Sequence, residues 1–117
     1  MNIAFYLSTC STCIKILGQL IVPENVQLQD IKTNKISLEQ LEEMRRLSGS
    51  YESLFSRRAI KYKSMGLNKK ELSEEDYKKL ILEEYTFLKR PVFLLDDQIF
   101  IGNSKKNIEA LTMQLNS

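Results

Sequence analysis

The sequence of 117 residues contains no histidine and no tryptophan, and it has only two cysteines. Histidine is the usual general base near neutral pH and the commonest metal ligand, so its absence excludes catalytic triads and histidine-based metal sites. Two cysteines cannot form a four-thiolate zinc site, and we therefore expect no bound metal. The chemistry of the chain must rest on other groups, and the spacing of the two cysteines becomes informative.

Long apolar runs and a strong charge bias are missing as well. The longest apolar runs, such as residues 20–22 and 92–95, are far shorter than the roughly 20 residues that span a bilayer. Seventeen Lys and Arg against fifteen Asp and Glu give a net charge of +2, which attracts phosphate backbones and anionic lipids only weakly. We therefore expect no direct nucleic-acid binding and no membrane association. The first residues lack a signal-peptide pattern, so a cytoplasmic location is expected.

The N-terminal third predicts a strand, a helix and a second strand. Residues 3–7 are apolar strand formers, and after Cys10 the apolar residues recur at helical spacing until Pro23 ends the helix. Residues 26–31 alternate between apolar and polar, as a half-buried strand does. A helix between two strands favours a βαβ unit with parallel strands.

The middle of the chain predicts helices, and the end predicts a hairpin and a helix. Ser37 with Gln40 forms a capping-box pattern for a helix that ends at Gly49, residues 54–65 continue as a basic helical stretch, and Ser73 begins a helix through residue 85. Residues 91–95 and 98–101 flank an Asp-Asp turn, and residues 104–115 form a last helix. This order predicts an α/β, thioredoxin-like fold with a four-stranded mixed sheet. We expect one domain over residues 1–117, with residues 37–88 as an inserted helical subdomain.

The two cysteines form a Cys10-Ser11-Thr12-Cys13 motif where the first strand meets the first helix. Free backbone N–H groups and the helix dipole at this place stabilise a thiolate, so Cys10 is the candidate nucleophile, and Ser11 and Thr12 are candidate anion contacts. Cys13, one turn later, could resolve an adduct on Cys10. Alternatively, Cys13 is only a small buried apolar side chain. Lys15 is interpreted as a solvated helix residue.

Three arginines and a proline complete the candidate site. Arg90 and Pro91 precede the third strand, where thioredoxin-like domains hold a cis proline that faces the nucleophile. A guanidinium beside that proline would point toward an oxyanion near Cys10. Arg57 and Arg58 form a second candidate anion contact. For each arginine the alternative is a solvated surface side chain.

The motif at residues 6–13, the arginine pair before residues 65–67, and the segments 88–92 and 101–104 together resemble the family of glutaredoxin-coupled arsenate reductases and Spx proteins. The resemblance covers essentially the whole chain. It implies a thioredoxin-like domain with a helical insert. It also implies that Cys10 is the nucleophile, that Arg90 and either Arg58 or Arg57 bind the anion, and that glutathione is a co-substrate and glutaredoxin a partner.

Several positions depart from the family's enzymes. The enzymes have arginines where this chain has Ile14 and Gly102, and a histidine where it has Tyr6, so arsenate affinity should suffer. Cys13 and Gly102 look like the Spx branch, in which an oxidised CxxC pair is a redox switch. Gly49 matches a glycine that Spx uses to contact the RNA polymerase α subunit.

Three functions therefore remain open from the sequence. The first is an arsenate-reductase-like enzyme acting on an oxyanion or a disulfide through Cys10. The second is a redox-sensing regulator that binds the RNA polymerase α subunit. The third is general thiol–disulfide exchange without arsenate specificity.

Overall fold

The computed structural model describes residues 1–116, and the chain divides into two units. The first unit contains Met1–Lys35 together with the chain from Arg90 onward, and the second contains Ile36–Lys89. The first unit carries the two cysteines and the Arg90–Pro91 segment, and the second carries the arginine pair.

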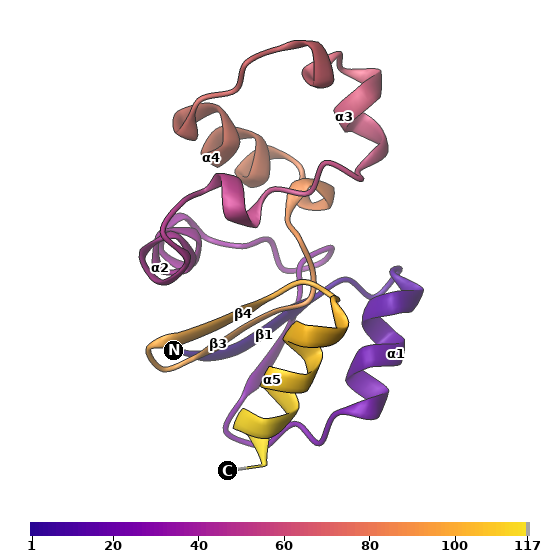
Figure 1. Ribbon diagram of the computed structural model, residues 1–117, viewed down its shortest axis with the longest axis vertical. Coiled ribbons are helices and arrows are strands. Elements are labelled where there is room, and N and C mark those ends of the chain that lie inside the picture. Colours follow the sequence, from indigo (N-terminus) through magenta and orange to yellow (C-terminus); the bar gives the residue numbers. More distant parts are fainter. Residues whose placement is uncertain (117) are drawn as a thin grey trace. The chain divides into compact units, whose positions relative to one another are not determined.

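A four-stranded mixed sheet forms the centre of the first unit (Figure 1). Its strands are β1 (Asn2–Tyr6), β2 (Gln27–Asp30), β3 (Val92–Leu95) and β4 (Gln98–Ile101). They lie in the order β2-β1-β3-β4, with β2 parallel to β1 and the other neighbours antiparallel. The predicted strands, the parallel pair, the hairpin and the mixed sheet are confirmed.

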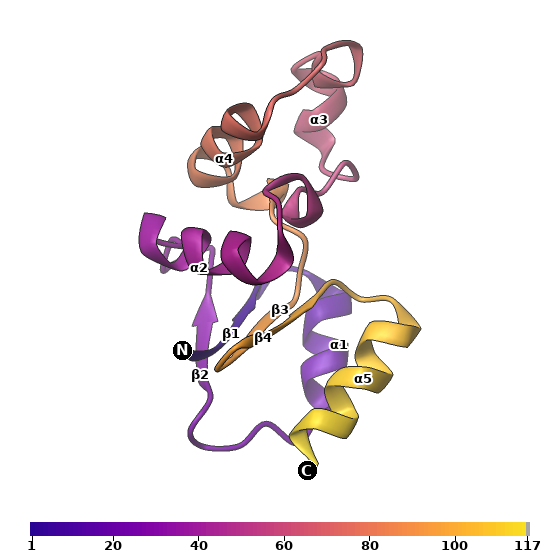
Figure 2. The ribbon, with the colours of Figure 1, turned by 60° about the vertical axis from the view of Figure 1, so that its left-hand side comes forward.

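Two helices cover one face of this sheet, α1 (Ser11–Gln19) and α5 (Lys105–Leu115), and they lie side by side in both ribbon views (Figure 2). Ala4 and Phe93 stand opposite each other on β1 and β3 and are fully buried under Ile16 of α1 and Leu111 of α5. The predicted cap of α5 is present, since the Ser104 hydroxyl accepts a hydrogen bond from the Asn107 N–H at 3.2 Å.

The end of α1 differs from the prediction. The helix ends at Gln19, with Leu20 as its C-cap, rather than continuing to Pro23. Ile21, one of the apolar residues that recur at helical spacing before Pro23, lies beyond the helix and is 81% exposed. Leu20 packs in the core although its backbone is extended, so the apolar spacing extends beyond the last residue of the helix.

The alternation over residues 26–31 predicts that Leu28 of β2 faces the core and that Gln29 faces solvent, and this prediction is wrong. Leu28 is 52% exposed, whereas Gln29 is 4% exposed. The Gln29 side-chain N–H donates to the backbone oxygen of Asn34 at 3.0 Å, so its burial leaves this polar group satisfied. Pairing with β1 decided which face each side chain takes, because a shift of one residue exchanges the two faces of a strand.

The second unit contains three α-helices, namely α2 (Leu38–Ser48), α3 (Ile60–Ser64) and α4 (Glu74–Glu83), and three short 3-10 turns, η1 (Glu52–Leu54), η2 (Leu67–Lys69) and η3 (Tyr85–Phe87). The Ser37–Gln40 capping box is present, and α2 ends at Gly49 in the left-handed conformation (φ 95°). Ser73 caps α4 through a second capping box, with Asp76 as the partner. Both predicted helix starts are confirmed.

The predicted helix over residues 54–65 is wrong in its first half. The backbone of Phe55 is extended and forms an isolated antiparallel bridge with Leu88. On either side of this bridge the Ser56 N–H donates to the Phe87 oxygen at 2.7 Å, and the Lys89 N–H donates to the Leu54 oxygen at 2.8 Å. These long-range hydrogen bonds hold the chain extended, so only Ile60–Ser64 becomes α-helical.

Aromatic packing explains why Phe55 takes that position. Its ring stacks on Phe87 with centroids 5.0 Å apart, and it also contacts Tyr77 at 4.9 Å and Tyr62 at 5.9 Å. Tyr62, Tyr77 and Phe87 are therefore packing residues around Phe55. Among residues 1–116, no helix has both the length and the apolar character that crossing a membrane requires.

Candidate functional site

Cys10 lies where β1 gives way to α1, and it is the N-cap residue of that helix. Its N–H donates to the Leu7 oxygen at 3.0 Å, and its carbonyl accepts from the Ile14 N–H at 3.1 Å. The side chain is half-buried. Sequence and structure therefore agree that the first cysteine is held at the positive end of a helix of nine residues.

Cys13 lies in the first turn of α1 and approaches Cys10 to 3.6 Å. It is fully buried, and both cysteines are free thiols. The alternative interpretation of Cys13 as a small buried apolar residue describes its burial correctly. Cys13 also lies close enough to Cys10 for the two thiols to form a hydrogen bond.

The pKa values of the two thiols are shifted in opposite directions. Burial raises the pKa of Cys10, but hydrogen bonds from the Cys13 backbone N–H and thiol and from the Arg90 guanidinium outweigh it, so this pKa lies below its ordinary value. For Cys13, burial and the neighbouring Cys10 together raise the pKa to about 11, although the hydrogen bond at Leu7 and the charge of Arg90 act in the opposite direction. A proton is therefore held by Cys13 more firmly than by Cys10.

Arg90 is the cation of this site. It lies in the same unit as Cys10, and its guanidinium both hydrogen-bonds the Cys10 sulfur and acts on it through its charge. The side chain is only partly exposed and acts on Cys10, which favours the interpretation of Arg90 as a site residue over that of a solvated surface residue. The Arg90–Pro91 peptide bond is cis, as we inferred by analogy with thioredoxin-like domains.

Asp30 anchors the loop before Cys10, although no motif in the sequence marked it as a site residue. Its Oδ1 accepts hydrogen bonds from the backbone N–H groups of Ser8 and Lys32, each at 3.2 Å. The Ser8 side chain is the largest cause that lowers the pKa of this carboxyl group. The available signal was an aspartate at the end of a strand parallel to β1, which places it beside Tyr6 and the start of the loop.

The positions around the thiols are open to solvent. Ser11 and Thr12 are exposed in the first turn of α1, where backbone N–H groups have no partner within the helix. Ile14 is 46% exposed. Lys15 is exposed and is absent from the groups that lower the pKa of Cys10, in accord with its interpretation as a solvated residue.

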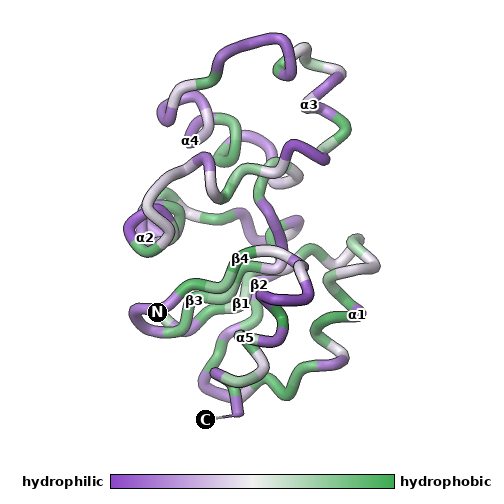
Figure 3. Tube along the Cα trace, viewed as in Figure 1, coloured by the Kyte–Doolittle hydropathy of each residue, from purple (hydrophilic) through white to green (hydrophobic). Residues whose placement is uncertain are grey.

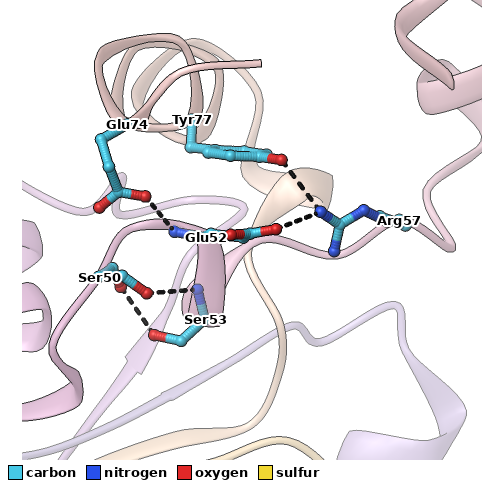
Figure 4. A network of polar contacts seen from close by, with 6 residues as sticks. All are labelled: Ser50, Glu52, Ser53, Arg57, Glu74 and Tyr77. Atoms are coloured by element: carbon cyan, nitrogen blue, oxygen red, sulfur yellow. Dashed lines mark hydrogen bonds and ion pairs between the residues drawn. The ribbon is translucent and has the colours of Figure 1, made fainter. Parts of the chain in front are cut away.

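Arg57 and Arg58 lie in the second unit, in a turn before α3 rather than on a helix as expected. Arg57 donates to Glu52 at 2.7 Å and to the Tyr77 hydroxyl at 3.0 Å, and Glu52 is the main cause that raises its pKa (Figure 4). Arg58 is exposed and makes no ion pair within residues 1–116. Of the two, Arg58 is the guanidinium that no neighbouring carboxylate occupies.

Figure 4 also shows the contacts of Glu74 with Glu52 and of Ser50 with Ser53, which hold the turn before Arg57. The carboxylate of Glu74 accepts hydrogen bonds from the backbone N–H groups of Tyr51 at 2.7 Å and Glu52 at 3.0 Å. Ser53 is tied to Ser50 through both its N–H and its hydroxyl. Within residues 1–116, no three Cys, Asp or Glu side chains gather in a way that could hold a metal ion.

Comparison with known proteins adds to this geometry. The sequence pattern of the ArsC family matches residues 5–111. The chain is 27% identical over 114 residues to a protein of Bacillus anthracis called global transcriptional regulator Spx 2, covering 92% of this chain and 84% of that one.

Solved structures show the same fold. An ArsC family related protein from Bacteroides fragilis is 25% identical, with a TM-score of 0.77, over 94% of this chain and 97% of the other. An arsenate reductase from Vibrio cholerae is 18% identical, with a TM-score of 0.73, over 97% and 96%. The predicted thioredoxin-like fold is thereby confirmed.

Proposed function

The chain belongs to the ArsC family, and from this premise we propose that it is a thiol-dependent oxidoreductase in which Cys10 is the nucleophile and Cys13 or glutathione resolves the adduct. One observation carries the proposal: two free thiols 3.6 Å apart have pKa values shifted in opposite directions. The thiolate is the reactive form of cysteine, so the lowered pKa of Cys10 favours attack by this residue. Cys13 keeps its proton until an adduct on Cys10 removes the neighbouring charge.

For a disulfide substrate the steps balance as follows. The Cys10 thiolate attacks one sulfur of the substrate, the substrate S–S bond breaks, and one thiolate leaves with the electron pair. Cys13 then loses its proton to that leaving thiolate and attacks the Cys10 sulfur, which releases the second substrate thiolate. The substrate has gained two electrons, and the Cys10–Cys13 disulfide is reduced again by two molecules of glutathione or by glutaredoxin. A cytoplasmic location, where glutathione keeps thiols reduced, suits this cycle.

For arsenate the Cys10 sulfur would bond to arsenic with loss of water. A second thiol, from Cys13 or glutathione, then attacks the Cys10 sulfur, and the S–As bonding pair stays on arsenic, so arsenite and a disulfide result. Arg90 and the N–H groups at Ser11 and Thr12 would balance the charge of the oxyanion. Pro91 would shape the site beside Arg90.

The two substrates are separated by one set of assays. NADPH consumption is followed with glutathione and glutathione reductase for the wild type, Cys10→Ser and Cys13→Ser. Glutaredoxin is added when arsenate is the substrate and is left out when a glutathione mixed disulfide is the substrate, because glutaredoxin reduces such disulfides by itself. We expect turnover of the mixed disulfide that Cys10→Ser abolishes, and weaker turnover of arsenate because Ile14 and Gly102 replace arginines of the family's enzymes. Full activity of Cys10→Ser with both substrates would refute the proposal.

A second candidate is a redox-sensing regulator, and the similarity to a Bacillus anthracis protein called Spx 2 favours it. Gly49 ends α2 exposed, and no described atom lies within 4 Å of a Cβ built on it, so a partner could approach its backbone closely. The test is co-purification with the RNA polymerase α subunit in reduced and oxidised states. Binding that changes with the Cys10–Cys13 redox state and is lost in Gly49→Arg supports this function, and absence of binding in both states excludes it.

A further inference from the structure

Charge is distributed unevenly along the chain, although the whole sequence carries only +2. Residues 53–70 contain six of the seventeen Lys and Arg and none of the fifteen Asp and Glu. The other 99 residues therefore hold eleven basic and fifteen acidic side chains, a net charge of −4. A local excess of one sign acts within about one Debye length, roughly 8–10 Å, regardless of the net charge.

Two of these six basic side chains form ion pairs with carboxylates of the second unit. Arg57 is paired with Glu52, and Lys61 forms an ion pair with Glu84. Arg58 is exposed and forms no ion pair within residues 1–116. Lys63, Lys69 and Lys70 are exposed and form no ion pair within the described part of the chain.

Large apolar side chains are exposed among these lysines. Ile60, the first residue of α3, is 88% exposed, and Met65, its C-cap, is 49% exposed. Figure 3 shows hydrophilic and hydrophobic stretches following each other along this short helix. Ile60 and Lys63 are three residues apart on α3 and so share a face. Met65 is the C-cap of α3, Lys69 lies on η2, which contacts α3, and Lys70 is the C-cap of η2. We call the exposed side chains of these two neighbouring elements, Ile60, Lys63, Met65, Lys69 and Lys70, the basic–apolar surface.

We propose that the basic–apolar surface docks an acidic protein segment that carries apolar side chains. Carboxylates complement the three exposed lysines, and apolar side chains remove Ile60 and Met65 from water. A nucleic acid would match the charge, but it would leave the two apolar side chains without partners. The aromatic ring of this segment that could stack on a base, Tyr62, packs edge-on against Phe55 and is half-buried.

The test separates charge from apolar contact with defined probes. Three fluorescein-labelled helical peptides of about 15 residues are compared. One carries Glu and Leu on one face, one has each Leu replaced by Ser, and one has each Glu replaced by Gln. A short DNA duplex is the fourth probe. Fluorescence anisotropy with the full-length reduced protein gives the affinities at low and physiological ionic strength. We expect the Glu/Leu peptide to bind most tightly.

Matched variants locate the binding. Lys69→Glu/Lys70→Glu should weaken binding of the Glu/Leu peptide by about tenfold or more, whereas Lys105→Glu/Lys106→Glu, an equally exposed lysine pair on α5, should leave it unchanged. Ile60→Ser should weaken it by about fivefold, whereas Ile21→Ser, at 81% exposure in the first unit, should not. All substituted side chains are exposed, and circular dichroism confirms that each variant folds.

Three results would overturn the proposal. They are no measurable binding of the Glu/Leu peptide, equal loss in both lysine variants, and DNA binding tighter than peptide binding with no dependence on Ile60. The readout involves no thiol chemistry, so its outcome is independent of whether Cys10 is a nucleophile.

Discussion

Selective alkylation of Cys10 is the sharpest consequence of the site geometry. The pKa of Cys13 is raised to about 11, mainly by burial, and that of Cys10 lies below the ordinary 9.0. At pH 7 about one Cys13 thiol in ten thousand is ionised, against more than about one in a hundred for Cys10. The thiolate of Cys10 is therefore more than about a hundredfold more abundant.

Intrinsic nucleophilicity works against this difference. A thiolate of higher pKa is the better nucleophile, with a Brønsted slope of about 0.4–0.5, so a gap of about two pKa units gives the Cys13 thiolate a six- to tenfold advantage. The net preference for Cys10 is still at least about tenfold. Complete burial of Cys13 increases it, because the reagent cannot reach that sulfur in the folded protein.

The assay is reaction with iodoacetamide between pH 5 and about 10, with peptide mass spectrometry to assign each labelled thiol. Cys13→Ala removes the thiol that hydrogen-bonds Cys10, so the apparent pKa of Cys10 should rise, whereas Cys13→Ser keeps a donor and should preserve it. Arg90→Ala should also raise it. Equal labelling of both cysteines, or an apparent pKa of Cys10 at or above 9.0, would refute the reasoning.

Three further predictions concern stability. The pKa of Asp30 is lowered below 3.8, so the ionised carboxylate stabilises the fold above that pH, and this stabilisation is lost as the pH falls through the lower pKa of the folded state. In an acid titration followed by circular dichroism, Asp30→Ala should lack this loss of stability. A titration that matches the wild type would contradict the prediction. Gly102→Ala should lower the free energy of unfolding by about 1–2 kcal/mol, because the backbone there has φ +87° even though there is space for a Cβ. Gly18→Ala, within α1, should raise the free energy of unfolding by about 0.5–1 kcal/mol. Equal effects of the two substitutions in urea melts would exclude backbone strain as the cause. Leu111→Ala, at a fully buried position, should cost about 2–5 kcal/mol in the same melts, and a loss below about 1 kcal/mol would contradict the packing of α5.

Local signals made much of the fold predictable. The Ser37–Gln40 capping box satisfies orphan N–H groups within one turn, so the start of α2 can be read from four residues. The Asp-Asp turn places Asp96 at φ 55°, a conformation that aspartate tolerates, so the hairpin of β3 and β4 is equally local. The CxxC motif at a strand–helix junction placed Cys10 at a helix N-terminus by the same kind of short-range reasoning.

The candidate site was predictable in its residues but not in its energetics. Cys10, Cys13, Arg90 and Pro91 were identified from spacing and family resemblance, and they lie in one unit. The opposite pKa shifts depend on how deeply each thiol is buried and on the Arg90 guanidinium, which is 80 residues away along the chain. A short sequence pattern predicts neither the depth of burial of a thiol nor a contact between residues so far apart in the chain.

The sequence by itself determined the order of elements, the caps and turns, and the cysteine pair, because each depends on hydrogen bonds or dihedral preferences within a few residues. The tertiary structure decided that Phe55 is extended, through its bridge to Leu88, and that Gln29 rather than Leu28 is buried in β2. It also decided that Asp30 holds the loop at Ser8. These outcomes depend on partners distant in sequence, whose packing and hydrogen bonds outweigh the local preferences of a segment.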